Sequence, residues 1–176
     1  MLEVGQRYSS NRGTWIEITD RSAGRMSFER SYAPRTGRAD PHYHLDLTQT
    51  WEAVSGAGEI EVDGEVRELR AGDRIVLEPG TPHRDPYLPD DGEFHVRGSF
   101  DPDTDFIEGY AEAWAHHMRE GTVNDQDEMP LTQILVIAQA TKGQSYTSRV
   151  PELLQRATLP LVAAFGRLRG FKTGYD

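Results

Sequence analysis

Two histidines separated by one residue are the first candidates for chemistry in this chain. His42 and His44 lie in the stretch PHYHLDLTQTWEAVSG, residues 41–56. Successive side chains of a β-strand point to opposite faces, so these two project from the same face and can reach one ion. Neutral imidazole is a common metal ligand. The pair therefore indicates half of a metal site.

A third histidine follows a strand-like run and a Pro-Gly turn in GDRIVLEPGTPH, residues 72–83. His83 joins the first pair only if the strands that carry them are neighbours, and spacing alone does not decide this. The chain contains no cysteine, which excludes disulfides, thiolate metal sites and cysteine nucleophiles. Histidine, carboxylate and amide groups must therefore carry the chemistry.

Length and charge limit the class of protein further. A chain of 176 residues is large enough for one domain with a substantial core. Its net charge of −10 repels the phosphates of nucleic acids and anionic lipids. It has neither an apolar run of membrane-spanning length nor the pattern of a signal peptide. We expect a cytoplasmic protein that binds a small molecule, with no nucleic-acid or membrane partner.

The elements that must position the histidines are short strands. From residue 1 to about residue 100, apolar-alternating runs are closed by Gly, Pro or Asp. Turn signals recur at the spacing typical of an antiparallel sandwich or barrel. Asp63-Gly64 in VDGEV predicts a tight hairpin, because both positions suit positive φ angles.

The pattern becomes helical after Phe100. The stretch DPDTDFIEGYAEAWAHHMREG, residues 101–121, has Asp103 or Thr104 as a helix cap and carries an apolar stripe at helical spacing. Two later helices are predicted to begin at prolines, and Pro160 is expected to kink or split the last one. We therefore predict a β-barrel domain over 1–102 and a helical extension over 103–176, packing on the barrel or on a dimer partner.

The charges divide the helical extension. Residues 103–128 hold eight acids and one base, whereas residues 141–172 hold six bases and one acid. Either these are two solvated faces, or the first and last helices pair antiparallel within one chain or across a dimer.

The two histidine stretches resemble the paired motifs of the cupin superfamily. The matching residues are His42, His44, Gly56, Gly72, Gly80 and His83. Three positions depart from the motifs. This chain has Gln49 where the motif has a glutamate, Glu78 where it has a proline, and Pro86-Tyr87 where it has an asparagine. The region from 103 to 176 also looks like the helical tail of some bacterial proteins with a conserved cupin barrel.

The resemblance implies a mainly β fold, a double-stranded β-helix of the jelly-roll type, with a C-terminal α-helical appendage. It implies that His42, His44 and His83 point inward to one divalent transition metal with an open coordination position. Three imidazoles suit Fe, Mn, Co, Ni, Cu or Zn, and the donor set does not select among them.

Gln49 changes what such a site would do. An amide offers a carbonyl oxygen without charge, so the ion would keep its full 2+ and favour an anionic oxygen ligand, while being held more weakly. Asp46, which continues the alternation of the histidine pair, is the alternative source of a carboxylate. A site without metal, in which the histidines serve only in hydrogen bonds, is the other alternative.

Three further residues are candidates for the substrate or the reaction. Trp51 shares the face of Gln49 and would form an apolar wall that binds substrate. His95 shares a face with Arg97; if that face is inward, His95 is a candidate catalytic acid or base and Arg97 a candidate substrate-binding residue. The alternative is that both lie on the outer surface of the strand.

Two classes of function follow. The first is a metal-dependent enzyme of the dioxygenase, isomerase or lyase type, acting on a small anionic, oxygen-bearing substrate. The second is a non-catalytic small-ligand-binding cupin with no metal or a degenerate site. Exposed strand edges and a long apolar tail predict a homodimer; docking of the last helix on a membrane would require an exposed apolar face.

Overall fold

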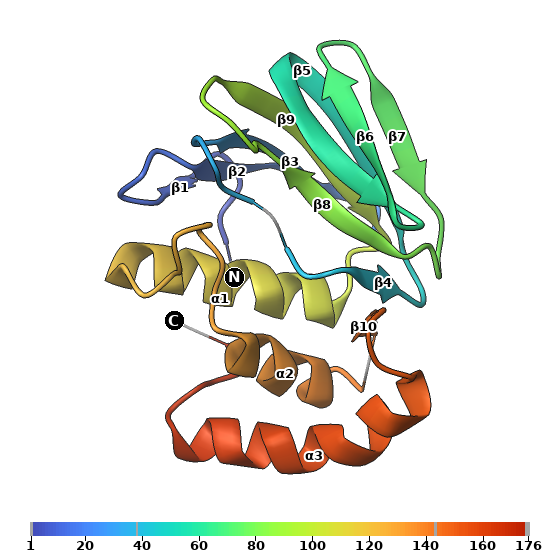
Figure 1. The fold of residues 1–176 in the computed structure, drawn as a ribbon. Coiled ribbons are helices and arrows are strands. Elements are labelled where there is room, and N and C mark those ends of the chain that lie inside the picture. Colours follow the sequence, from blue (N-terminus) through green and yellow to red (C-terminus); the bar gives the residue numbers. More distant parts are fainter. Residues whose placement is uncertain (1, 38, 143, 175–176) are drawn as a thin grey trace.

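A computed structural model describes residues 2–37, 39–142 and 144–174 as a β-barrel followed by three helices (Figure 1). The strands are β1 (Arg7–Ser9), β2 (Trp15–Ser22), β3 (Arg25–Tyr32), β4 (His42–His44), β5 (Thr48–Val62), β6 (Glu65–Arg70), β7 (Arg74–Leu77), β8 (His83–Tyr87), β9 (Phe94–Asp101) and β10 (Ser145–Thr147). The helices are α1 (Asp105–Glu120), α2 (Leu131–Ala140) and α3 (Glu152–Leu168).

The named strands pair antiparallel in the order β1-β2-β3-β9-β5-β8-β4-β10, and β6 and β7 also pair with β5. This is the double-stranded β-helix with a helical appendage that the sequence predicts. The order matters for chemistry because β8 lies between β5 and β4. The strand that carries His83 is thereby a direct neighbour of the strand that carries His42 and His44.

Two sequence runs that read as separate strands form the single long strand β5. Its register shifts between Ala53 and Ser55, and Gly56 continues the strand with a φ of 74°. A Cβ at Gly56 would lie 1.8 Å from the backbone oxygen of Glu93, so the close approach of β9 requires glycine here. The glycine that ends the first histidine motif therefore lies within a strand, just after a bulge, and not in a turn.

The hairpin between β5 and β6 forms as predicted. Asp63 and Gly64 both have positive φ, 52° and 81°, as a type I′ turn requires.

The helices stack outward from the barrel, with α2 between α1 and α3 (Figure 1). The hydroxyl of Thr104 accepts a hydrogen bond from the backbone of Ile107, which makes Thr104 the N-cap of α1. Pro160 does not split the last helix, which runs unbroken through it. Pairing of the acidic first helix with the basic last helix within one chain is wrong, because α2 separates them.

The extension also adds a strand to the barrel. β10 pairs antiparallel with β4, so that Ser145 lies opposite His44 and Thr147 opposite His42. The segment between α2 and α3 therefore lies directly beside the histidine-bearing strand. The sequence does not predict β10, because a strand of three residues is too short to show an alternation of apolar and polar side chains.

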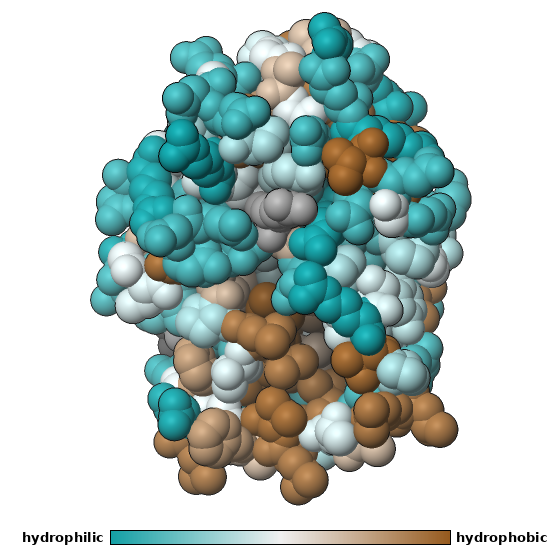
Figure 2. Space-filling model, viewed as in Figure 1, coloured by the Kyte–Doolittle hydropathy of each residue, from teal (hydrophilic) through white to brown (hydrophobic). Residues whose placement is uncertain are grey.

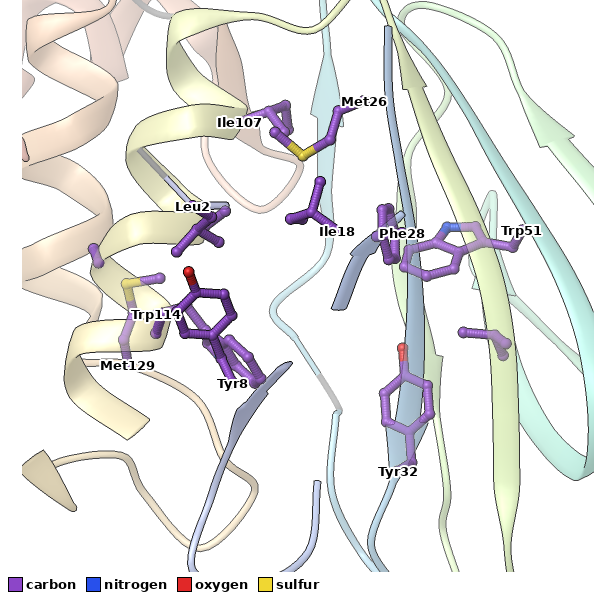
Figure 3. Packing of buried hydrophobic residues seen from close by; sticks show 14 of the residues in the cluster. Leu2, Tyr8, Ile18, Met26, Phe28, Tyr32, Trp51, Ile107, Trp114 and Met129 are labelled. Atoms are coloured by element: carbon purple, nitrogen blue, oxygen red, sulfur yellow. The ribbon is translucent and has the colours of Figure 1, made fainter. Parts of the chain in front are cut away.

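Apolar residues of the barrel and of α1 form one core. Figure 3 shows Ile107 of α1 facing Met26 of β3, and Trp114 of α1 belongs to the same cluster. The indole nitrogen of Trp114 donates to the backbone oxygen of Asp127 at 2.9 Å, so its polar atom is satisfied within the core. This shared core fixes α1 over the barrel. Among the helices of the described ranges, none is long and apolar enough to cross a membrane.

Candidate metal centre

The structure brings the three histidines together. His42 lies opposite His83 across the β4–β8 pair, and His44 lies one alternation further along β4. One ligand atom from each of the three lies within 4.8 Å of the others. Three imidazoles at this spacing can bind one ion. The local sequence of β4 and β8 does not show that the two strands bring their histidines together.

Backbone carbonyls set the ring orientation of two of these histidines. Nδ1 of His42 lies 2.8 Å from the carbonyl oxygen of Asp40, and Nδ1 of His83 lies 2.8 Å from that of Thr81. A carbonyl only accepts, so Nδ1 donates in both rings and Nε2 keeps its lone pair. Nε2 of His83 is buried and has no hydrogen-bond partner among the described residues. This nitrogen is therefore available to bind a metal ion.

The surroundings of His44 and His83 disfavour their protonated forms. Burial lowers the pKa of His44 well below its ordinary value, and the neighbouring His42 and His83 lower it further. Burial and then His42 lower the pKa of His83 to about 4, against a smaller opposing effect of Asp85. Neutral imidazole is the form that binds metal, so no proton has to leave these two rings at neutral pH.

Gln49 lies beside the cluster and is held by a carboxylate. Its side chain is 1% exposed, and its amide nitrogen donates to Oδ1 of Asp85 at 3.0 Å. The same carboxylate oxygen lies 3.7 Å from Nε2 of His83. Because the amide nitrogen is engaged, Oε1 points elsewhere, and it is buried without a partner in the described chain. A buried acceptor without a donor is costly unless an ion occupies its free side.

Asp85 is the functional residue that sequence reasoning missed. The signal was present, because His83 and Asp85 alternate along β8 as His42 and His44 alternate along β4. The alternative carboxylate, Asp46, is exposed in the bend between β4 and β5 and stays outside the histidine cluster. The chain therefore places its carboxylate on β8.

These groups fit a divalent transition metal. Three imidazole nitrogens and one amide oxygen make a neutral set of intermediate softness. The unpartnered buried atoms of His83 and Gln49 are the structural observation that favours an ion here. The carboxylate of Asp85 supplies one negative charge next to this set.

The other candidate residues do not join the cluster. Trp51 shares the inward face of Gln49, but it is packed in the core, edge-on to Phe28 with ring centres 5.2 Å apart. The inward orientation considered for His95 and Arg97 is wrong, because Phe94 and Val96 occupy the buried face of β9.

Both residues lie on the outer face of β9 around Glu29. Nε2 of His95 lies 3.3 Å from one carboxylate oxygen of Glu29, and the guanidinium of Arg97 lies 3.1 Å from the other. The His95 ring also lies 5.2 Å from that of Trp15.

A cavity of about 410 Å³ extends from the histidines toward the helices. His42, His44, Gln49 and Asp85 line its barrel end. Side chains of all three helices and of β10 line the rest. This volume lies within the range of about 300–1,000 Å³ that is usual for small-molecule sites.

A family model and several solved structures are similar to this chain. The family model for the cupin domain matches residues 28–85, a span that contains the three histidines, Gln49 and Asp85. The comparison with curated proteins found no match.

Among solved structures, KdgF from Halomonas sp. is 28% identical, with a TM-score of 0.48; the match covers 57% of this chain and 90% of that one. A Cupin 2 conserved barrel domain protein from Salinispora arenicola is 21% identical, with a TM-score of 0.46 and coverages of 63% and 97%. A protein with a double-stranded β-helix domain from Klebsiella pneumoniae is 22% identical, with a TM-score of 0.46 and coverages of 54% and 84%.

Proposed function

Because this chain belongs to the cupin superfamily, we propose that its barrel holds one divalent transition metal and that the protein is a metal-dependent enzyme acting on a small molecule. His42, His44 and His83 are the nitrogen ligands. Gln49 is the oxygen ligand. The observation that carries the proposal is the convergence of three imidazoles, with the buried, unpartnered amide oxygen of Gln49 in the side chain next to them.

The residues around the ion have separate tasks in this proposal. The carbonyls of Asp40 and Thr81 hold two rings with Nε2 free. Asp85 accepts from the Gln49 amide nitrogen, which leaves the amide oxygen without a partner in the described chain and available to an ion. When bound, the metal acts as a Lewis acid toward an oxygen of the substrate. Because the ligand set is neutral, the ion keeps its charge and attracts an anionic oxygen. Dioxygenase, isomerase and lyase reactions all use such a centre.

Asp85 is also the carboxylate that accepts a proton from the substrate. It lines the cavity next to the ligands, and its side chain is 15% exposed. A base for this task must lie within reach of the bound molecule. Asp85 meets that requirement, whereas His95 lies on the far face of β9.

Metal titration tests this proposal. Metal-free wild-type chain is titrated with Zn(II), Mn(II) and Fe(II) by calorimetry, beside His44→Ala and the control His95→Ala. We expect one equivalent to bind to wild type and to His95→Ala, with binding lost in His44→Ala. If the wild-type chain binds no metal, the alternative function remains: a barrel that binds a small ligand without catalysis.

We also propose that the chain forms a homodimer through α3. Leu153, Leu161 and Leu168 recur at intervals of seven or eight residues, on one face, and are 81%, 76% and 87% exposed. Figure 2 shows apolar surface gathered over the part of the molecule formed by α2 and α3. Monomers rarely expose patches of this kind, and a second copy supplies a matching apolar face.

A further inference from the structure

The cavity above the histidines differs in chemistry between its two ends. At the barrel end it meets the side chains of His42, His44, Gln49 and Asp85. Much of the remaining lining consists of apolar side chains of α1, α2 and α3, namely Phe106, Ile107, Ile134, Leu135, Leu159 and Val162. The helical extension therefore forms most of the wall, and the barrel forms only the polar base.

Several of these apolar groups are not fully covered by the protein. Ile134 and Leu135 of α2 and Leu159 and Val162 of α3 are half-buried, although they face the cavity. An apolar ligand that covers them removes that surface from water, which stabilises the complex. A polar ligand would gain nothing there.

The charges in the cavity limit the head group of that ligand. Asp40 and Asp85 line it, and among the described lining residues Arg149 is the only Lys or Arg. Arg149 is more than half exposed and paired with Asp40 at 3.2 Å, so its charge is already engaged. The described lining therefore offers an incoming anion no Lys or Arg side chain other than this paired one. An anionic head group therefore requires the metal.

We propose that the ligand of this site is an amphipathic monoacid: an alkyl or aryl body enclosed by α1, α2 and α3, with one anionic oxygen group at the histidine centre. The assignment of the head group rests on the proposed metal function. The assignment of the apolar body rests on the cavity walls alone. The helical extension thereby selects the substrate, and the barrel performs the chemistry.

Two ligand series separate these parts. The full chain, Zn(II)-loaded or metal-free, is titrated by calorimetry with butanoate, hexanoate and octanoate, and with the corresponding primary alcohols. We expect the affinity to rise about three- to fourfold per methylene in both series. The loaded chain should prefer octanoate over 1-octanol by at least tenfold, and the metal-free chain should prefer the alcohol.

A matched pair of variants on α2 tests the position of the apolar body. Ala138 is buried and lines the cavity, whereas Ala140 is exposed two residues later. Ala138→Phe should abolish the gain between hexanol and octanol, and Ala140→Phe should keep it. If circular dichroism shows that Ala138→Phe does not fold, Val162→Phe on α3 fills the same cavity from the opposite wall.

The outcomes are distinct. Affinity that does not change with chain length in the metal-free alcohol series overturns the proposal. Equal chain-length gains in Ala138→Phe, Val162→Phe and wild type also overturn it, because the body then lies elsewhere. Chain-length gains without any preference of the loaded chain for the acid support the apolar body and contradict the metal-bound head group.

Discussion

The amide nitrogen of Gln49 lies 3.0 Å from a carboxylate oxygen of Asp85. Gln49 comes from the end of β5 that pairs with β7 and β9, whereas Asp85 comes from β8, beside the other end of β5. The contact leaves the amide oxygen without a partner in the described chain, and it places the Asp85 carboxylate 3.7 Å from Nε2 of His83. The carboxylate that the motif lacks at residue 49 is thus supplied by another strand, as a partner of the amide.

Gln49→Glu should strengthen metal binding and weaken the metal-free fold. The new carboxylate would lie against Asp85, and two like charges at this distance repel unless a cation separates them. We expect affinity for Zn(II) to rise about tenfold or more, equivalent to about 1.4 kcal/mol, and the metal-free unfolding temperature to fall. Competition with a chromogenic chelator and thermal unfolding measure the two effects.

Gln126→Glu is the control for added charge, because Gln126 is exposed. It should leave both values unchanged. An unaltered affinity in Gln49→Glu would show that residue 49 does not reach the ion.

Asp85→Ala and Asp85→Asn should differ in metal affinity. Alanine removes the acceptor of the Gln49 amide, so the amide turns freely and affinity falls about 10- to 100-fold. Asparagine keeps an acceptor oxygen, so its affinity should stay within a few-fold of wild type. Calorimetric titration with Zn(II) measures both. Equal losses in the two variants would mean that the charge of Asp85, and not its hold on Gln49, supports the ion.

The metal-free chain should lose stability as the pH falls from 7 to 4.5. The pKa of His83 is about 4 in the folded state and about 6.5 in the unfolded state, so the unfolded chain takes up the proton first. The contribution of His83 to the free energy of unfolding is present above pH 6.5 and is lost toward pH 4. It amounts to roughly 2–3 kcal/mol. The lowered pKa of His44 acts in the same direction.

Urea unfolding at the two pH values measures this loss. His83→Gln removes one of the titrating groups and should reduce the difference between pH 7 and pH 4.5. The same pH dependence in wild type and variant would contradict the assignment.

The apolar face of α3 should set the oligomeric state. Leu161→Glu places a charge in the proposed dimer contact and should yield a monomer in sedimentation velocity, while the wild type sediments as a dimer. Val66→Glu, at an exposed valine of β6, is the matched control and should remain dimeric. A monomeric wild type at micromolar concentration would refute the dimer. If that monomer floats with phosphatidylcholine vesicles, the apolar face binds lipid instead.

Much of the fold could be predicted because local signals and family motifs agree with the tertiary structure. Local rules predict three features: the hairpin at Asp63-Gly64, the start of α1 at Thr104, and the inward orientation of the Gln49 side chain. The role of Gly56 does not follow from local rules, because it depends on the approach of Glu93, which lies far away in sequence.

The candidate site was harder to predict where it depends on contacts between distant elements. The meeting of His83 with His42 depends on strand order, which only the family resemblance suggested. The partnership of Gln49 with Asp85 depends on side chains that meet between strands. The outward phase of His95 depends on which face of β9 is buried, and both of its faces carry large side chains.

Elemental analysis of untagged protein, purified without chelator, tests the central claim most directly. Wild type should contain about one equivalent of a single transition metal, and His44→Ala should contain none. A wild-type chain that carries no metal, and takes up none when dialysed against Fe(II), Mn(II), Ni(II) or Zn(II), would contradict the metal centre and leave the three histidines as hydrogen-bonding residues of a ligand-binding barrel.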